Sequence, residues 1–291
     1  MIRSAITRTQ STVVATLLGH KQLPVALPCL RSLLQQSADS VSLRLHDDGS
    51  LDDGDIERLG SELGSVTLVM RSEADLRADA MLAGYPNTRA FRSQHALALK
   101  LVDLWLFGGE SIVYCDADVL FLRPFRGLFR PGPAPRAVFM SDVRTSYSIK
   151  SWQLLRLSEA RPIRDVNTGI ILFPTNGYDP DRVEWFLGRP ELHSPPVWAE
   201  QTCWAFLAAG VPCEILSPAQ FAIASHPPKT PVALHFVTPS RHLIADYLRP
   251  MDAGPLPVDV AFVPARQCTP GSLLASEIAR RVARMRAAVH G

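Results

Sequence analysis

"SIVYCDADVLFLRPF", residues 111–125, places two carboxylates inside a run that is otherwise mainly apolar. In an extended strand residues i and i+2 point to the same side, so Asp116 and Asp118 would share one face with their Cα atoms roughly 6 to 7 Å apart. Two crowded carboxylates raise each other's pKa unless a cation lies between them. The stretch therefore predicts a buried strand that carries a pair of candidate metal ligands.

The chain before this stretch alternates apolar runs with segments of helical periodicity. The β-branched run at 11–19 ends at a glycine and is typical of a buried strand in a parallel sheet. The same reasoning predicts a strand from 41 that breaks at Asp47-Asp48-Gly49, a strand at 65–72, and helices at 24–36, 55–63 and 93–108. Strands that alternate with helices predict an α/β sandwich with a largely parallel sheet.

The chain after residue 125 is less regular. We expect loop at first, then strands at 137–142, 166–174 and 232–237, and a helix that begins near Trp198. No internal repeat is present. Between Pro250 and Pro264 the proline density predicts an irregular strap, followed by a helix from Gly271 to the end. This organisation suggests a main domain over 1–250 and an appended segment over 251–291.

The final helix carries an apolar stripe and four arginines outside it. The stripe consists of Leu274, Ile278, Val282, Met285 and Val289, and the arginines are Arg280, Arg281, Arg284 and Arg286. We expect the stripe to pack on the domain and the basic face to be solvated. Peripheral binding to anionic lipid is the alternative.

The composition of the chain excludes several classes of protein. With 291 residues, 47% of them hydrophobic and 20% charged, the chain can bury a large core, so disordered and fibrous classes are excluded. A net charge of +2 gives no reason to expect nucleic acid. Five cysteines without a CxxC pair favour a reducing compartment. No apolar run approaches a membrane span, so we expect a soluble, cytoplasmic protein.

Polar residues follow three of the predicted strands. Ligands of open parallel sheets bind beyond the carboxyl ends of the strands. The candidates at such places are Asp47 and Asp48, Asp116 and Asp118, and His235 in "VALHFV".

Four motifs together resemble the nucleotide-sugar glycosyltransferases of the GT-A fold, which implies a Rossmann-like three-layer α/β sandwich with a mixed, mainly parallel sheet. The nearest group is glycosyltransferase family eight, which includes glycogenin and the lipopolysaccharide galactosyltransferases. The motifs are "YCDADVLFLRP", "VNTGIILF", "AEQTCW" and "LHF", in the order of the family over roughly residues 11–250. "LHFVTPSRH" departs from the family by lacking the glycine and the lysine that usually follow the histidine.

The resemblance implies a role for each candidate residue. Asp118 would bind a metal ion directly, Asp116 would assist through the metal or the ribose, and His235 would complete the ligand set. An imidazole ligand favours Mn²⁺ somewhat over Mg²⁺. Asn167 would hold sugar or acceptor hydroxyls, and Glu200 with Gln201 would lie near the anomeric carbon.

Four further residues have both a structural and a functional interpretation. Asp47 and Asp48 fit ordinary turn chemistry, or contact the nucleotide base or ribose. Lys100 would be an unpaired charge on a buried helix unless it meets Asp103 or a phosphate. Arg92, like Arg89, could face the diphosphate or be merely solvated.

The sequence therefore predicts a metal-dependent hexosyltransferase. It would move a hexose from a nucleotide sugar, most plausibly a UDP-sugar, to a glycan or another hydroxyl acceptor, with retention at the anomeric carbon. A catalytically silent sugar-nucleotide or carbohydrate-binding module is the alternative. A phosphatase of the haloacid dehalogenase type is less favoured, because Leu120 stands where that motif has Thr or Val.

Overall fold

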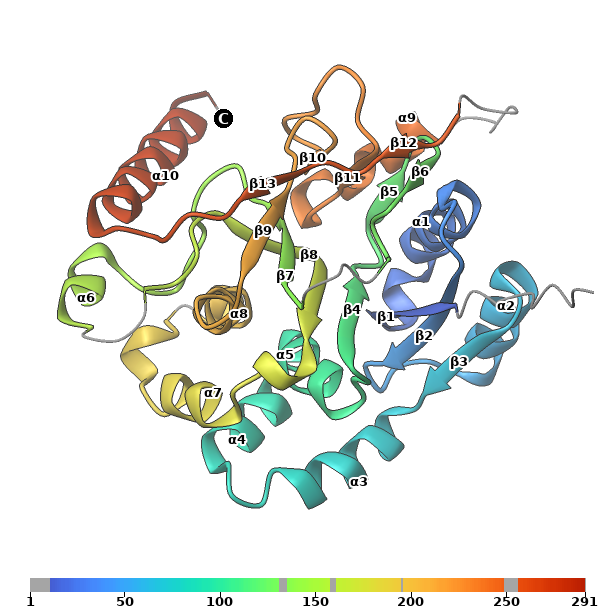
Figure 1. Ribbon diagram of the computed structural model, residues 1–291, viewed down its shortest axis with the longest axis horizontal. Helices are drawn as coiled ribbons and strands as arrows, with labels where there is room; N and C mark the ends of the chain where they lie inside the picture. The colour runs from blue at the N-terminus through green and yellow to red at the C-terminus, as the bar shows by residue number, and fades with distance from the viewer. Residues whose placement is uncertain (1–10, 131–134, 158–160, 195, 249–255, 291) are drawn as a thin grey trace, which may run out of the picture.

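The computed structural model describes residues 11–130, 135–157, 161–194, 196–248 and 256–290. Its centre is an eight-stranded sheet with the order β13-β9-β7-β8-β4-β1-β2-β3 (Figure 1). Only β8 and β13 run against the other strands, which confirms a mixed, mainly parallel sheet. In chain order the strands of this sheet are β1 (Thr12–Leu18), β2 (Val41–Asp47), β3 (Val66–Val69), β4 (Ser111–Cys115), β7 (Ala137–Ser141), β8 (Val166–Pro174), β9 (Cys213–Leu216) and β13 (Phe262–Pro264).

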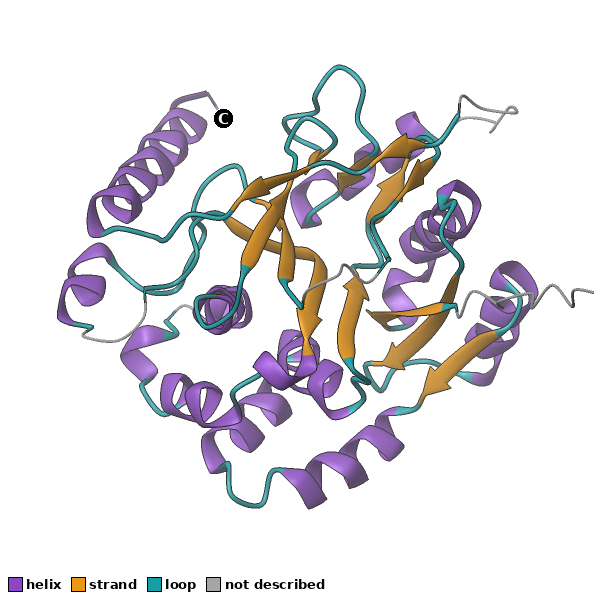
Figure 2. Ribbon diagram, in the orientation of Figure 1, coloured by secondary structure: helices purple, strands orange, loops and turns teal. Residues whose placement is uncertain are grey.

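Helices cover both faces of the sheet and complete the predicted three layers (Figure 2). One face packs against α1 (Leu23–Gln36) and α2 (Asp53–Leu63). The other packs against α3 (Arg71–Met81), α4 (Pro86–Gln94), α5 (Ala96–Leu106), α7 (Pro180–Leu187) and α8 (Ala199–Ala208). Three further helices lie outside these layers: α6 (Ser151–Arg156), α9 (Ile244–Tyr247) and α10 (Pro270–His290).

Strand β1 is covered on both faces, which explains why its sequence is apolar almost throughout. Val14 and Leu18 belong to the core under α1 and α2, whereas Ala15 belongs to the core under α5. Alternate side chains of a strand point to opposite faces, so a strand covered on both sides needs apolar residues at successive positions.

A small sheet beside the main one brings a distant segment to the acidic stretch. It consists of β5 (Val119–Phe121), β11 (Ala233–His235) and β10 (Phe221–Ile223). Strand β11 runs antiparallel to β5, with His235 opposite Val119. The backbone N–H of Phe236 also donates to the carbonyl of Asp118 at 2.9 Å. This pairing places His235 beside Asp118.

The prediction that one buried strand within residues 111–125 carries both carboxylates is wrong in one respect. The structure divides it into β4 and β5, and residues 116–118 form a turn closed by the Val119 N–H on the Asp116 carbonyl at 3.2 Å. The turn ends the main sheet at this point and starts the small one. The two carboxylates therefore converge through a turn and not through the pleat of one strand.

The segment after residue 255 adds one strand to the main sheet and one to a separate two-stranded sheet. Strand β13 pairs with β9 at the edge of the main sheet, and β12 (Val258–Asp259) pairs with β6 (Phe125–Arg126). The predicted irregular strap is thus wrong for 258–264, and its part at 250–255 lies outside the described residues. The proposed division at residue 250 separates stretches that share these sheets.

Helix α10 packs with a different face from the one predicted. Leu273 and Ser276 are buried, whereas Leu274, Ile278 and Met285 of the predicted stripe are exposed by 48%, 54% and 60%. A contact with α6 helps to set this orientation, because the Glu277 side chain of α10 accepts the backbone N–H of Ser151, the first residue of α6, at 2.9 Å. Val289 lies beyond the described side chains.

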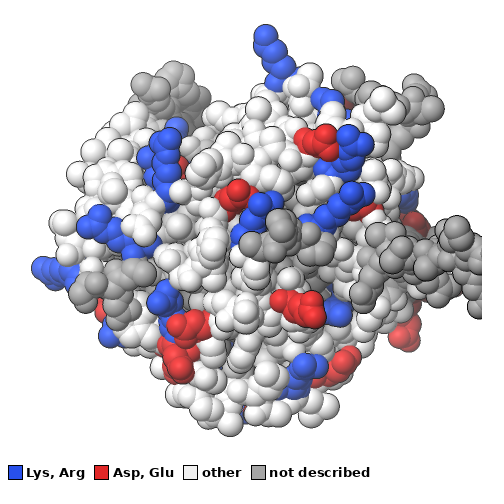
Figure 3. Space-filling model, in the orientation of Figure 1, with Lys and Arg blue, Asp and Glu red and all other residues white. Residues whose placement is uncertain are grey.

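The surface carries charges of both signs. On the face drawn in Figure 3, Lys and Arg lie among Asp and Glu, which agrees with the small net charge. In the described part of the chain, no helix combines the length and the apolar character that a membrane crossing requires.

Candidate active site

A cavity of about 610 Å³ opens at the edge of the sheet where β1 and β4 end and β8 begins. Most residues that the sequence predicts for the site line this cavity. They are Asp48, Lys100, Asp116, Asp118, Asn167, Glu200, Gln201 and His235. Asp47 and Arg92 do not line it. The site thus occupies the place where open α/β sheets bind ligands.

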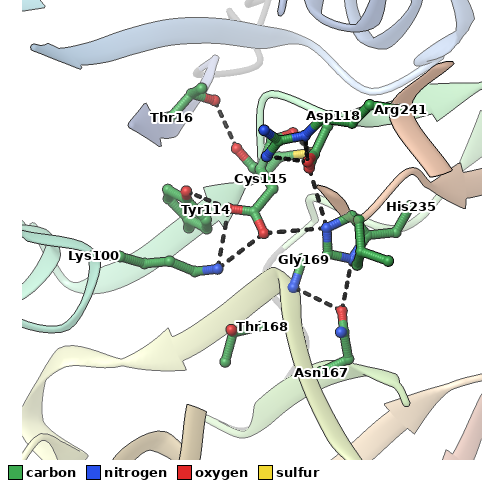
Figure 4. A network of polar contacts seen from close by, with 12 residues as sticks. Thr16, Lys100, Tyr114, Cys115, Asp118, Asn167, Thr168, Gly169, His235 and Arg241 are labelled. Carbon is green, nitrogen blue, oxygen red and sulfur yellow. Dashed lines mark hydrogen bonds and ion pairs between the residues drawn. The ribbon is translucent and has the colours of Figure 1, made fainter. Parts of the chain in front are cut away.

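Asp116, Asp118 and His235 form a compact set of possible metal ligands. Figure 4 shows Asp118 beside the His235 ring. The His235 Nε2 atom lies 3.4 Å from Asp116 Oδ2 and 3.1 Å from Asp118 Oδ1. Two ligands at right angles on a six-coordinate ion with bonds of about 2.1 Å are roughly 3 Å apart. The donor set, one imidazole and two carboxylates, therefore fits one divalent cation such as Mn²⁺ or Mg²⁺.

Charges around this set keep Asp118 ionised and, while no cation is bound, raise the pKa of the His235 ring. Burial opposes ionisation of Asp118, yet the His235 ring and the Arg241 guanidinium lower the pKa of this carboxyl to about 2. Burial likewise opposes the charged imidazole, but Asp118 and Asp116 raise the pKa of His235 above its ordinary value. The pocket is thus built to keep negative charge where a cation would bind.

Asp116 is held by two neighbours that come from different elements. Lys100 of α5 donates to its two oxygens at 3.0 and 2.9 Å, and the Tyr114 hydroxyl donates to Oδ1 at 2.5 Å. Lys100 is only 3% exposed, and although burial opposes its charge, Asp116 raises its pKa. The buried lysine therefore finds Asp116 and not Asp103 as its partner.

Arg241 is a site residue that the sequence analysis missed. Its Nε and Nη2 atoms donate to Asp118 Oδ2 at 2.9 and 2.7 Å, and it lines the cavity. It belongs to the 3₁₀ helix at Thr238–Leu243, directly after β11. The signal was present in "LHFVTPSRH", which has an arginine six positions after the histidine although it lacks the expected lysine.

Glu200 lies at the buried floor of the cavity. It is 4% exposed, its Oε2 accepts the Thr168 hydroxyl at 3.1 Å, and its Oε1 has no hydrogen-bond partner. Burial raises the pKa of this carboxyl to about 7, against the opposing charge of Lys100 and with a contribution from Asp116. A buried carboxyl with one unpartnered oxygen is destabilising unless something else uses it, which is typical of a functional site.

Gln201 is anchored by its amide nitrogen, which donates to the carbonyl of Ser146 at 3.0 Å and toward Asp142 Oδ2 at 3.5 Å. Asp142 also lines the cavity and was missed by the sequence analysis. Burial raises the pKa of the Asp142 carboxyl. It follows β7 directly, so the rule of polar residues after strands could have found it.

Two expected nucleotide-binding residues have structural roles in the fold. Asp47 is 5% exposed, and its Oδ1 accepts the backbone N–H groups of Gly49, Ser50 and Leu51 at 2.8 to 3.2 Å. It forms the turn, whereas its neighbour Asp48 reaches the cavity.

Arg92 is the second of these residues, and the prediction that it faces the diphosphate is wrong for this structure. It is 6% exposed and donates to both oxygens of Asp103 at 2.6 and 2.9 Å and to Asp75 at 2.6 Å. A buried carboxylate on α5 needs a cationic partner, and Arg92 of α4 provides it.

Comparisons with known proteins support the fold. No protein-family model matches the sequence, and no curated protein matches it. The apo structure of mouse xyloside xylosyltransferase 1 is 10% identical, with a TM-score of 0.51 over 79% of this chain and 99% of its own.

Two other solved structures are similar with lower scores. The galactosyltransferase LgtC, in complex with donor and acceptor sugar analogues, is 11% identical over 83% of this chain and 98% of its own, with a TM-score of 0.48. The mannosyltransferase Ktr4p from S. cerevisiae is 10% identical over 69% and 66%, with a TM-score of 0.47. Both TM-scores are below 0.5, so the fold is inferred without these two structures. The xylosyltransferase match and the strand order together show the GT-A fold that the motifs predict.

Proposed function

We propose that this chain is a metal-dependent hexosyltransferase that uses a nucleotide sugar, most plausibly UDP-linked, and a hydroxyl acceptor. The observation that carries the proposal is the convergence of Asp116, Asp118 and His235 at the ligand-binding edge of a GT-A fold, with spacings suited to one divalent cation. A divalent cation at such a site neutralises the charge of a departing diphosphate.

The remaining residues have roles that follow from their contacts. Lys100 acts through Asp116, which it orients and partly neutralises. Arg241 keeps one oxygen of Asp118 engaged, so that the other oxygen faces His235 and the cation. Asp48 lies on the wall of the cavity that β2 provides, where a nucleotide base or ribose would bind.

We propose retention at the anomeric carbon. Gln201 cannot serve as a base, and because its amide nitrogen is held by Ser146, its amide oxygen is the atom left to stabilise positive charge on the sugar. Glu200 has a pKa of about 7, a value suited to a general base, so it is the residue that an inverting reaction would use instead.

The experiment that tests this function needs no knowledge of the acceptor. Titration calorimetry of UDP with Mn²⁺ and with EDTA measures whether the cation promotes nucleotide binding, and a screen of nucleotide sugars for slow metal-dependent hydrolysis identifies the donor. Equal UDP affinity with and without Mn²⁺ would contradict the proposal. Metal-dependent binding without any turnover would favour the silent binding module.

We also propose a reducing, cytoplasmic location. All five cysteines are described, and none forms a disulfide. Free thiols are usual where glutathione and thioredoxin keep cysteines reduced.

A further inference from the structure

The side-chain amide of Asn167 has an orientation that its neighbours fix. The backbone N–H of Gly169 lies 3.0 Å from one terminal atom of this amide. A backbone N–H can only donate, so that atom is the oxygen, Oδ1. The Nδ1 atom of His235 lies 2.9 Å from the same oxygen. Because Oδ1 accepts, the His235 Nδ1 atom must carry a proton.

A proton on Nδ1 determines what the other ring nitrogen can do. Nε2 lies 3.4 Å from a carboxylate oxygen of Asp116 and 3.1 Å from one of Asp118. Figure 4 shows the opposite side of the ring facing Asn167. Only a nitrogen with a free lone pair can bind a metal ion, and the hydrogen bond on the opposite nitrogen selects which one that is. We propose that Asn167 is a positioning residue that keeps the proton on Nδ1, so that Nε2 presents its lone pair to a divalent cation. This inference rests on the proposed function.

Gly169 takes part in the same arrangement in two ways. A Cβ atom at this position would lie 2.5 Å from His235 Nδ1 and 2.9 Å from Asn167 Oδ1, which is closer than real Cβ contacts come. Its carbonyl accepts the backbone N–H of Asp116 at 2.7 Å. The start of β8 therefore holds two ligand-bearing segments at once: the acidic turn through the Gly169 backbone, and His235 through Asn167.

Burial makes this hydrogen bond consequential. Asn167 and His235 are each 5% exposed, so water is a poor substitute for either partner. Replacing the outer-shell partner of a metal-ligating histidine typically weakens metal binding by roughly 10- to 100-fold. The Asn167 oxygen thus serves the histidine, and only its Nδ2 group remains for the sugar or acceptor hydroxyls expected from the sequence.

The first test measures Mn²⁺ binding alone, by electron paramagnetic resonance of the free ion at one fixed pH without nucleotide. Asn167→Leu, which keeps a similar shape but has no acceptor, should bind Mn²⁺ roughly 10- to 100-fold more weakly than the parent. Asn167→Asp keeps an acceptor for the Nδ1 proton and should therefore avoid this loss of Mn²⁺ affinity. Thr168→Val is the matched control, because it removes the neighbouring buried hydroxyl that donates to Glu200 and leaves the His235 contact intact.

The second test reads the proton directly. In the parent labelled with ¹⁵N-histidine and saturated with Mg²⁺, NMR should show His235 protonated at Nδ1 and not at Nε2, and Asn167→Leu should lose this preference. A proton on Nε2 in the Mg²⁺-bound parent overturns the inference even if the leucine variant does not fold. Parent-like Mn²⁺ affinity in a folded Asn167→Leu overturns it while leaving the proposed function intact. A parent that binds no divalent cation overturns both.

Discussion

Replacing Glu200 by glutamine should stabilise the protein, and by more at alkaline than at acidic pH. The ordinary carboxyl pKa of 4.5 is raised to about 7 in the fold by burial. The folded protein therefore holds this proton more tightly than the unfolded chain does. The stabilising contribution is complete below pH 4.5 and is lost as the pH rises from 4.5 to about 7. Over that whole range the loss is about 3 kcal/mol, of which about 2.5 kcal/mol falls between pH 5 and pH 8.

Urea unfolding of the parent and Glu200→Gln at pH 5 and pH 8, with EDTA present, measures this effect. The free energy of unfolding of the variant relative to the parent should be higher at pH 8 than at pH 5 by about 2.5 kcal/mol. Glu57→Gln, which removes the same charge from an exposed position on α2, is the matched control. The same relative stability of Glu200→Gln at both pH values would refute the reasoning that burial raises the pKa of Glu200.

Four other outcomes follow from the site and the packing. Asp118→Asn should abolish donor turnover and weaken UDP binding by calorimetry only when Mn²⁺ is present; an equal loss in EDTA would mean that Asp118 acts without a cation. Arg92→Met should lower the free energy of unfolding by roughly 3 to 5 kcal/mol, because it leaves Asp103 buried and unpaired, and should leave UDP affinity unchanged. Weakened UDP binding in a stable Arg92→Met variant would instead support the predicted contact between Arg92 and the diphosphate. Leu273→Asp should lower the Tm by roughly 5 to 10 °C, whereas Ile278→Asp, at an exposed position of the same helix, should change it by less than about 2 °C; the reverse ranking would return the predicted stripe to the interface. Proton NMR of the first product from an α-linked donor should show an α-linkage, and a β-linkage would make an inverting mechanism with Glu200 as base the better account.

The strands and helices that enclose the site were predictable because their patterns are local. The apolar run of β1 and the helical spacing of α1 each contain their own signal, and the structure confirms both. The acidic turn and His235 were also visible in sequence, because polar side chains stand out directly after apolar runs.

The charge partners could not be predicted in this way. Arg92 and Arg241 look alike in sequence as arginines in short polar segments, yet one neutralises Asp103 between two helices and the other binds Asp118 from a distant segment. The partner of Arg92 is decided by the packing of α4 on α5. The partner of Arg241 is decided by the packing of the 3₁₀ helix at Thr238–Leu243 on the acidic turn. Similarly, periodicity in α10 reveals that an apolar stripe exists but not which face its neighbours cover.

The pairing of β11 with β5 has a consequence for how the protein is made. His235 lies 119 positions after Asp116, and Arg241 lies 123 positions after Asp118, so the candidate cation site joins two parts of the chain that are synthesised far apart in time. A nascent chain that has not yet reached β11 has the acidic turn but lacks the imidazole that completes the ligand set. Cation binding at the proposed site would therefore require that the small sheet has formed. Because an ion that binds only the folded state adds its binding free energy to stability, a divalent cation at the proposed site would favour the chain in which the small sheet has formed.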